Sequence, residues 1–183
     1  MLEKFKIQLG RKSGRVGEIK PVRVNDSQHI SIVASLAQKI WREHYTAIIG
    51  IKQVEYMLDK LQSENAIKAQ IGKEGYMYFL LEHSEGRRVG YFAIVPRGEE
   101  LFLSKFYITA EDRRRGYGKE ALEFIEETAR REGCSKIGLV VNKRNSSVKA
   151  YQGLGFVITD SVITNIGDGF IMDDYRMEKT INP

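Results

Sequence analysis

Three consecutive arginines followed by two closely spaced glycines make one short segment of this sequence well suited to bind an anion. The segment runs from Arg113 to Gly118, after an apolar stretch typical of a strand and before a helical pattern. A helix N-terminus offers unpaired N–H groups and the positive end of the helix dipole, which together can hold a phosphate. Glycines there would let the backbone approach the anion without an obstructing Cβ. On its own, the same hexapeptide could equally form a tight turn with a solvated basic surface.

Further along the chain, a tyrosine and two asparagines could also contribute to a site. Asn142 and Asn145 follow an apolar strand pattern, and Tyr151 lies in the short helical pattern after them. A phenol can donate a proton to a leaving group, although most aromatic side chains in such patterns pack in a core. The single cysteine, Cys134, excludes an intrachain disulfide, and the three histidines lack metal-ligand spacing. We therefore assign no metal.

Hydrophobic periodicity indicates the elements that must position these residues. Strand patterns cover 18–24, 76–81, 89–95, 101–108, 136–141, 156–163 and 170–179, and helical patterns cover about 27–45, 54–61, 118–131 and 146–154. The polar stretch 62–74 shows no clear period. The order β-α-α-β-β-β-α-β-α-β-β predicts an α+β domain with a mostly antiparallel sheet and one parallel junction.

Length and composition fit one globular domain. The chain has 183 residues, of which 42% are hydrophobic and 29% charged, with 3 prolines. We expect a basic N-terminal extension over 1–17 and a single domain over 18–183. The net charge of +5 suits an anionic ligand. No apolar run approaches the ~20 residues of a membrane helix and none resembles a signal peptide, so we expect no membrane partner and a cytoplasmic location.

The segment from Leu103 to Phe156 resembles the GNAT superfamily of acetyl-CoA-dependent N-acyltransferases. Arg113, Gly116 and Gly118 match the family's pyrophosphate loop, the two asparagines follow the next strand as in many members, and 150–156 matches the final signature. The similarity in element order extends from about residue 19 to 179. It implies a mixed, mostly antiparallel sheet that is split between the fourth and fifth strands and flanked by about four helices.

The resemblance also implies roles for individual residues, with acetyl-CoA as the cofactor. Backbone groups of three successive strand residues would pair with the pantetheine arm and polarise the thioester carbonyl. The arginine loop would hold the pyrophosphate, the asparagines would contact the cofactor, and Tyr151 would lie beside the sulfur and protonate it. The implied cofactor-binding residues are Phe106, Tyr107, Ile108, Arg113, Arg114, Arg115, Gly116, Tyr117, Gly118, Asn142, Asn145 and Tyr151.

The general base is less clearly marked. Many family members carry a carboxylate two positions before the residue that matches Phe106, whereas this chain has Ser104. Glu99 and Glu100, at the start of the same strand, are the nearest acidic candidates for catalysis. A chain of water molecules is the alternative, because a primary amine with a pKa near 10 needs only a modest proton acceptor.

The acceptor site implied by the resemblance lies between the N-terminal helices and the last hairpin. Its candidate residues are Trp41, Tyr45, Asp173 and Asp174, in regions similar to bacterial polyamine N-acetyltransferases. We therefore expect an N-acetyltransferase acting on a primary amine of a small molecule, with a polyamine favoured. A protein or peptide amine, or a catalytically weak acetyl-CoA sensor, remain alternatives, and a homodimer is left open. No aromatic RNA platform or helix-turn-helix pattern supports a nucleic-acid partner.

Overall fold

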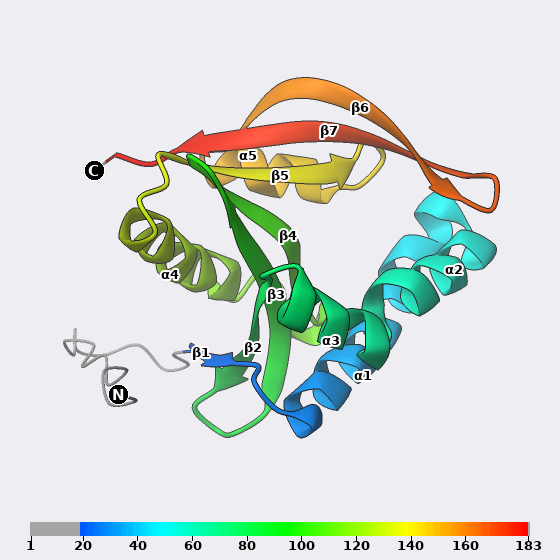
Figure 1. Ribbon diagram of the computed structural model, residues 1–183, viewed down its shortest axis with the longest axis horizontal. Helices are drawn as coiled ribbons and strands as arrows, with labels where there is room; N and C mark the ends of the chain where they lie inside the picture. Colours follow the sequence, from blue (N-terminus) through cyan, green and yellow to red (C-terminus); the bar gives the residue numbers. More distant parts are fainter. Residues whose placement is uncertain (1–18, 183) are drawn as a thin grey trace.

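A seven-stranded sheet forms the centre of the protein in a computed structural model that describes residues 19–182 (Figure 1). The strand order is β1-β2-β3-β4-β5-β7-β6, and every neighbouring pair is antiparallel except β4 and β5. The expected extension over 1–17 lies outside the described residues. The strands are β1 (Ile19–Arg23), β2 (Met77–His83), β3 (Arg88–Arg97), β4 (Glu100–Ile108), β5 (Lys136–Asn142), β6 (Val157–Gly167) and β7 (Phe170–Thr180).

Helices cover both faces of this sheet (Figure 1). Three of them pack through one apolar cluster with β2 and β3, and α4 packs through a second cluster with the strands on the opposite face. The helices are α1 (Ser27–Ile49), α2 (Ile51–Gln62), α3 (Glu64–Lys73), α4 (Tyr117–Arg131) and α5 (Ser147–Gly153), with a short 3-10 turn at Ala110–Asp112. Among residues 19–182, no helix is long and apolar enough to cross a membrane.

The predicted fold class is confirmed, with one helix added. The segment expected to lack regular structure forms α3, which raises the number of α-helices described from about four to five. Ser63 caps this helix, since its Oγ accepts a hydrogen bond from the N–H of Ala66 at 3.3 Å. Only Ile67 and Gln70 are buried in it, so its apolar pattern is too sparse to detect by periodicity.

The first helix is longer than expected and carries residues toward the site. Asp26 caps its N-terminus by accepting the N–H of His29 at 2.8 Å. The helix ends at Ile49 rather than near Tyr45, because Gly50 takes a positive φ of 81° that stops it. Tyr45 is therefore held within regular helix rather than in a loop.

The predicted split of the sheet lies between β4 and β5. Their parallel pairing covers only Glu100–Phe102 opposite Lys136–Gly138, although both strands continue further. In the β3–β4 pair, Ala93 lies opposite Lys105 and Ile94 opposite Leu103, so Ser104 is the extra residue of a β-bulge. A bulge bends the strand that carries it. We attribute the divergence of β4 from β5 to this bend.

Candidate functional site

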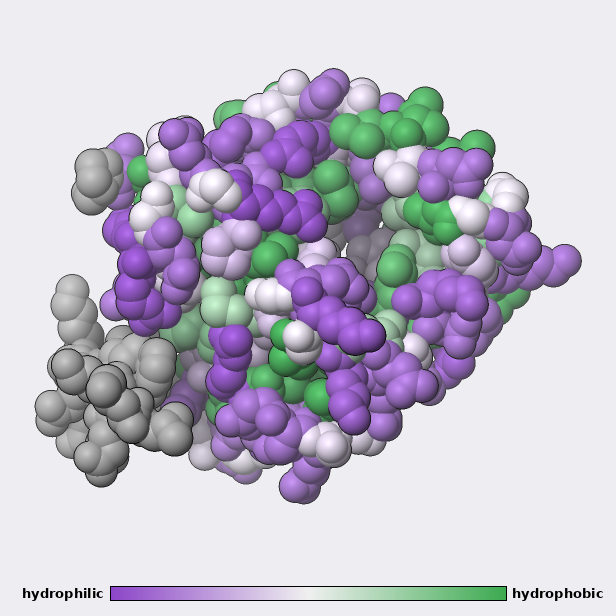
Figure 2. Space-filling view, in the orientation of Figure 1, coloured by the Kyte–Doolittle hydropathy of each residue, from purple (hydrophilic) through white to green (hydrophobic). Residues whose placement is uncertain are grey.

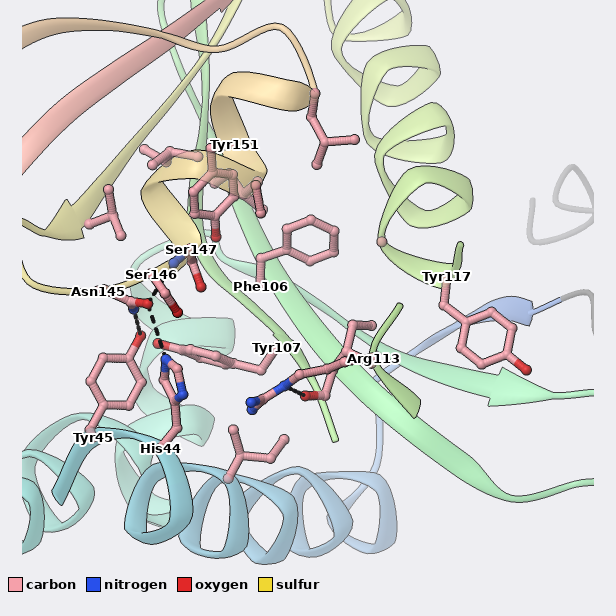
Figure 3. A pocket seen from close by; sticks show the side chains of 18 of the residues that line it. His44, Tyr45, Phe106, Tyr107, Arg113, Tyr117, Asn145, Ser146, Ser147 and Tyr151 are labelled. Carbon is pink, nitrogen blue, oxygen red and sulfur yellow. Dashed lines mark hydrogen bonds between the residues drawn. The ribbon is translucent and has the colours of Figure 1, made fainter. Parts of the chain in front are cut away.

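A cavity of about 510 Å³ lies at the split between β4 and β5. Residues of β4, β5, α1, α4 and α5 all contribute to its wall, together with the loop before α4 (Figure 3). The lining residues are Ile40, His44, Tyr45, Leu103, Ser104, Phe106, Tyr107, Ile108, Asp112, Arg113, Arg114, Tyr117, Gly118, Leu139, Val140, Val141, Asn145, Ser146, Ser147, Ala150, Tyr151 and Leu154.

The arginine loop reaches this cavity in a conformation suited to an anion. Arg114 and Gly116 both have positive φ, at 62° and 90°, which turns the chain sharply into α4. Arg113 donates from Nε to the Ile108 carbonyl at 3.1 Å, so its guanidinium lies at the cavity wall (Figure 3). Gly118 lines the cavity at the start of α4, where the helix dipole favours negative charge.

A buried carboxylate holds the loop in place. Asp112 is 2% exposed and accepts two hydrogen bonds from Arg87 Nη1, at 2.6 and 2.7 Å, and one from Thr109 Oγ1 at 2.9 Å. Burial alone would raise the pKa of Asp112, but the bonds from Arg87 and Thr109 outweigh it and hold that pKa below its usual value. Arg115 lies 3.9 Å from the same carboxylate and does not line the cavity.

Asn145 links α5 to α1 at the other side of the cavity. Its Nδ2 donates to the Tyr45 hydroxyl at 3.1 Å, while Oδ1 accepts from His44 Nε2 at 3.1 Å and from the Ser147 N–H at 2.9 Å (Figure 3). The residue is 4% exposed, and both its amide oxygen and its amide nitrogen form hydrogen bonds. The arrangement suits a residue that fixes the wall of the cavity.

Tyr151 projects from α5 into the cavity near Phe106 (Figure 3), and its ring also packs against that of Phe156. The ring centroids lie 6.4 Å and 5.6 Å from those of Phe106 and Phe156. Burial, with a smaller contribution from Tyr45, raises the pKa of the Tyr151 phenol well above its ordinary value. The phenol therefore keeps its proton at neutral pH and is available as a hydrogen-bond donor in the cavity.

The geometry fits an extended ligand with an anionic end. Phe106, Tyr107 and Ile108 line the cavity on the part of β4 beyond its last pair with β5. A strand edge that faces a gap can hydrogen-bond an extended amide-bearing chain as another strand would. The arginine loop lies next along the chain, at the N-terminus of α4. Acetyl-CoA has this form, with amides in the pantetheine arm and a pyrophosphate beyond it.

Several predicted residues are not brought to the cavity. Glu100 is 7% exposed and forms an ion pair with Arg176. It lies at the N-terminal end of β4, where this strand is hydrogen-bonded to β5. Glu99 accepts hydrogen bonds through its backbone carbonyl from the N–H groups of Ser135 and Lys136. Neither glutamate lines the cavity, so the structure gives no support to either as the base. Asn142, Arg115 and Gly116 are also absent from the lining.

Of the four predicted acceptor residues, one lines the cavity and three do not. Tyr45 lines the cavity, whereas Trp41 is 4% exposed and stacks on Tyr45 at 4.5 Å between centroids. Asp173 pairs with Lys143 at 2.5 Å and is largely exposed. Asp174 is 7% exposed, and its Oδ1 is buried without a hydrogen-bond partner among the described residues. The adjacent aspartates thus differ in their availability to a ligand.

Sequence reasoning missed Lys105, which is 7% exposed on β4 beside the cavity-lining Ser104. Its Nζ lies 3.1 Å from Ser104 Oγ. A signal was present in the sequence, since Lys105 is the one charged residue between Leu101 and Ile108 in an otherwise buried strand pattern. Residues such as Ser146 and Ser147 carried no comparable signal, because their position depends on how α5 packs.

Comparisons with known proteins agree with this geometry. The family model described as "Acetyltransferase (GNAT) family" matches residues 35–156. Over 106 residues, which are 54% of this chain and 70% of the relative, the sequence is 28% identical to the uncharacterized N-acetyltransferase YhdJ of Bacillus subtilis.

Two solved structures show the same fold. The PaiA N-acetyltransferase of Thermoplasma acidophilum, in complex with coenzyme A, superposes with a TM-score of 0.73 at 19% identity, covering 90% of this chain and 98% of that one. A chimera of the spermidine N-acetyltransferase SpeG from Vibrio cholerae and hSSAT gives a TM-score of 0.65 at 16% identity, covering 91% of this chain and 96% of that one. Because the family model spans well over half of the sequence, the chain belongs to the GNAT acetyltransferase family and is an acetyl-CoA-dependent N-acetyltransferase.

Proposed function

We propose that the protein transfers the acetyl group of acetyl-CoA to a primary amine of a small cationic molecule, with a polyamine as the favoured acceptor. The observation that carries the transfer reaction is the cavity in the split sheet, which combines a free strand edge, the arginine loop and Tyr151. The spermidine N-acetyltransferase chimera shares the fold and is consistent with such an acceptor.

The residues around the cavity suit direct attack of the amine on the thioester. The amine nitrogen forms a bond to the carbonyl carbon, the carbon–sulfur bond breaks, and negative charge develops on the carbonyl oxygen. Backbone N–H groups of the free part of β4, around Phe106–Ile108, would stabilise that charge. Tyr151 would donate its proton to the departing sulfur.

Asp174 is the residue that favours a cationic acceptor. It shares a face of β7 with Met172, because alternate residues of a strand point the same way, and Met172 packs against the cluster of α1–α3. Figure 2 shows the molecular surface hollowed below β7, between β4 and the α1–α2 side. A buried carboxylate with one unpartnered oxygen is costly unless a cation or donor reaches it.

The electrostatics of Asp174 give this proposal a pH signature. Burial, with the neighbouring charge of Asp173, raises the pKa of Asp174 to about 6, while Lys143 acts in the opposite sense. The carboxylate is therefore mostly ionised at pH 7 and mostly protonated at pH 5. We predict that the KM for a cationic acceptor rises as pH falls through about 6, and that the KM for acetyl-CoA follows this change much less.

An amine panel with matched aspartate variants tests the proposal. Thiol release from acetyl-CoA would be followed with spermidine, a single-charge alkylamine of similar length and a lysine-containing peptide. Asp174→Asn is expected to raise the spermidine KM about 10- to 100-fold, the range of one hydrogen bond to a charged group, with the acetyl-CoA KM nearly unchanged. Asp173→Asn is the matched control, because its carboxylate is already paired with Lys143.

The outcomes separate the parts of the proposal. Equal KM changes in both aspartate variants would refute the role of Asp174. Efficient turnover of the peptide alone would replace the small-molecule acceptor with a protein amine, and binding of acetyl-CoA without turnover of any amine would favour a sensor.

A further inference from the structure

A lysine is buried in β4 directly beside the cavity, and the transfer chemistry described above does not use it. Lys105 is 7% exposed, and no carboxylate within residues 19–182 forms an ion pair with it. Lysine is almost never this buried without a charged partner. Burying an unpaired amine costs free energy, and groups with such perturbed environments concentrate at functional sites.

Two aromatic rings lie near the Lys105 amine, and one hydroxyl group lies between the amine and the cavity. Lys105 Nζ lies 5.3 Å from the ring centroid of Tyr76 and 5.5 Å from that of Tyr78. Its one hydrogen bond within the described chain is the 3.1 Å contact with Ser104 Oγ. Ser104 is the extra residue of the β-bulge and lines the cavity. The hydroxyl therefore connects the buried amine to the cavity.

We propose that Lys105 accepts, through the Ser104 hydroxyl, the proton that the acceptor amine loses when it attacks the thioester. This inference rests on the proposed acetyl transfer and identifies the proton acceptor for it. The attacking nitrogen forms its bond to carbon and gives a proton to Ser104 Oγ, while the Ser104 proton moves to the lone pair of Lys105 Nζ. The sulfur leaves with the electrons of the carbon–sulfur bond and is protonated by Tyr151. Lys105 afterwards releases its proton to water, and the tyrosine recovers one, so the products are an amide and a thiol.

The titration of Lys105 suits this role. Burial lowers its pKa to about 8, and the negative charge of Glu74 only partly offsets that effect. The other titratable or charged groups around it are Tyr76 and Tyr78, with Arg97 bonded to the Tyr76 hydroxyl at 3.1 Å. With a pKa of about 8, roughly a tenth of the lysine is neutral at pH 7, and this fraction rises with pH. For an exposed lysine, the neutral fraction at pH 7 is several hundred times smaller.

The test combines a titration with kinetics of three variants. In the full-length protein, the Lys105 ε-methylene resonance would be identified by its loss in Lys105→Met, and its midpoint is expected near pH 8. The kcat with acetyl-CoA and spermidine, or the panel amine with the highest turnover, should rise with pH through the same midpoint. Lys105→Met should lower kcat about 100-fold or more and abolish the rise of kcat with pH, while the coenzyme A Kd stays unchanged.

Two further variants separate proton transfer from packing and from charge. Lys105→Arg keeps the positive charge but cannot lose its proton, so it should be as slow as Lys105→Met. Ser104→Ala should also be slow, whereas Ser104→Thr restores a hydroxyl and should recover most of the rate. Lys68→Met, on the exposed face of α3, is the matched control and should behave as wild type.

The possible failures are distinguishable. If no amine releases thiol from acetyl-CoA, the proposed function fails and the Lys105 role falls with it. If turnover is normal in Lys105→Met or in Lys105→Arg, only the Lys105 role is overturned. A lysine midpoint near 10.5 would contradict it in the same way, because the amine would then hold its proton at neutral pH.

Discussion

The hydroxyl of Tyr151 can be removed with little effect on packing, because it is the ring that packs against Phe106 and Phe156. We predict that Tyr151→Phe lowers kcat by on the order of 10- to 1,000-fold while the coenzyme A Kd stays within about twofold, since the substitution removes a proton donor and keeps the ring. Single-turnover thiol release measures the chemical step directly. Tyr175→Phe, on β7 outside the cavity lining, is the control. Wild-type turnover of Tyr151→Phe would exclude the phenol as the acid.

At the scale of single residues, sequence motifs located some of the side chains that line the cavity, while the roles assigned to them stay predictions. Tyr151 and Arg113 belong to such motifs, and both line the cavity. The sequence could not show that Asp174 is buried while Asp173 is exposed and paired. This difference depends on which face of β7 is covered and on Lys143, which comes from another segment. The isolation of Lys105 in an apolar strand pattern was a signal of its burial, but its aromatic surroundings could not be predicted, because Tyr76 and Tyr78 come from a distant part of the sequence.

The junction between the arginine loop and α4 offers a test at the scale of an element. Gly118 is a helical residue that lines the cavity, and a Cβ there would meet no protein atom within 4 Å. We predict that Gly118→Ala leaves the Tm unchanged or raises it, since alanine favours the helix by up to about 1 kcal/mol. The same methyl group should obstruct the pyrophosphate and raise the coenzyme A Kd about tenfold or more. Thermal melting and calorimetric titration measure the two effects.

Gly116 provides the matched comparison. It also has open space around it, but its φ of 90° is unfavourable for any residue with a Cβ, by about 1–2 kcal/mol. Gly116→Ala should therefore lower the Tm, in contrast to Gly118→Ala. If Gly118→Ala binds coenzyme A as tightly as wild type does, the anion does not lie against the start of α4.

The elements themselves were largely predictable, because strands and helices with one buried face repeat at their own period. The helix α3 was missed since only Ile67 and Gln70 are buried in it, and the cap at Ser63 was its one local signal. The split of the sheet was expected from the family resemblance alone. Its physical origin, the bulge at Ser104, depends on the register of β3 against β4, which no local pattern specifies.

At the scale of the whole molecule, the last hairpin differs from the rest of the sheet. Strand β6 forms one end of the strand order, and its residues are mostly exposed. Large apolar side chains of the hairpin are exposed to solvent: Ile163 is 72% exposed, Val157 60% and Ile171 of β7 56%. Figure 2 shows hydrophobic residues gathered along this upper edge of the molecule. An open strand edge beside exposed apolar side chains is typical of a surface that pairs with another chain.

We predict that two copies of the chain associate through β6, because the same edge on each copy can continue the sheet and cover these side chains. Light scattering coupled to size exclusion should give twice the 20.9 kDa of the chain at micromolar concentration. Ile163→Lys should shift the mass toward the monomer, because a charge on the outer strand opposes pairing. The control is Ile51→Lys, which places the same charge on α2 at a side chain 49% exposed and should leave the mass unchanged. A monomeric wild-type protein at every concentration would contradict the prediction, and the apolar hairpin would then require an occupant other than a second copy.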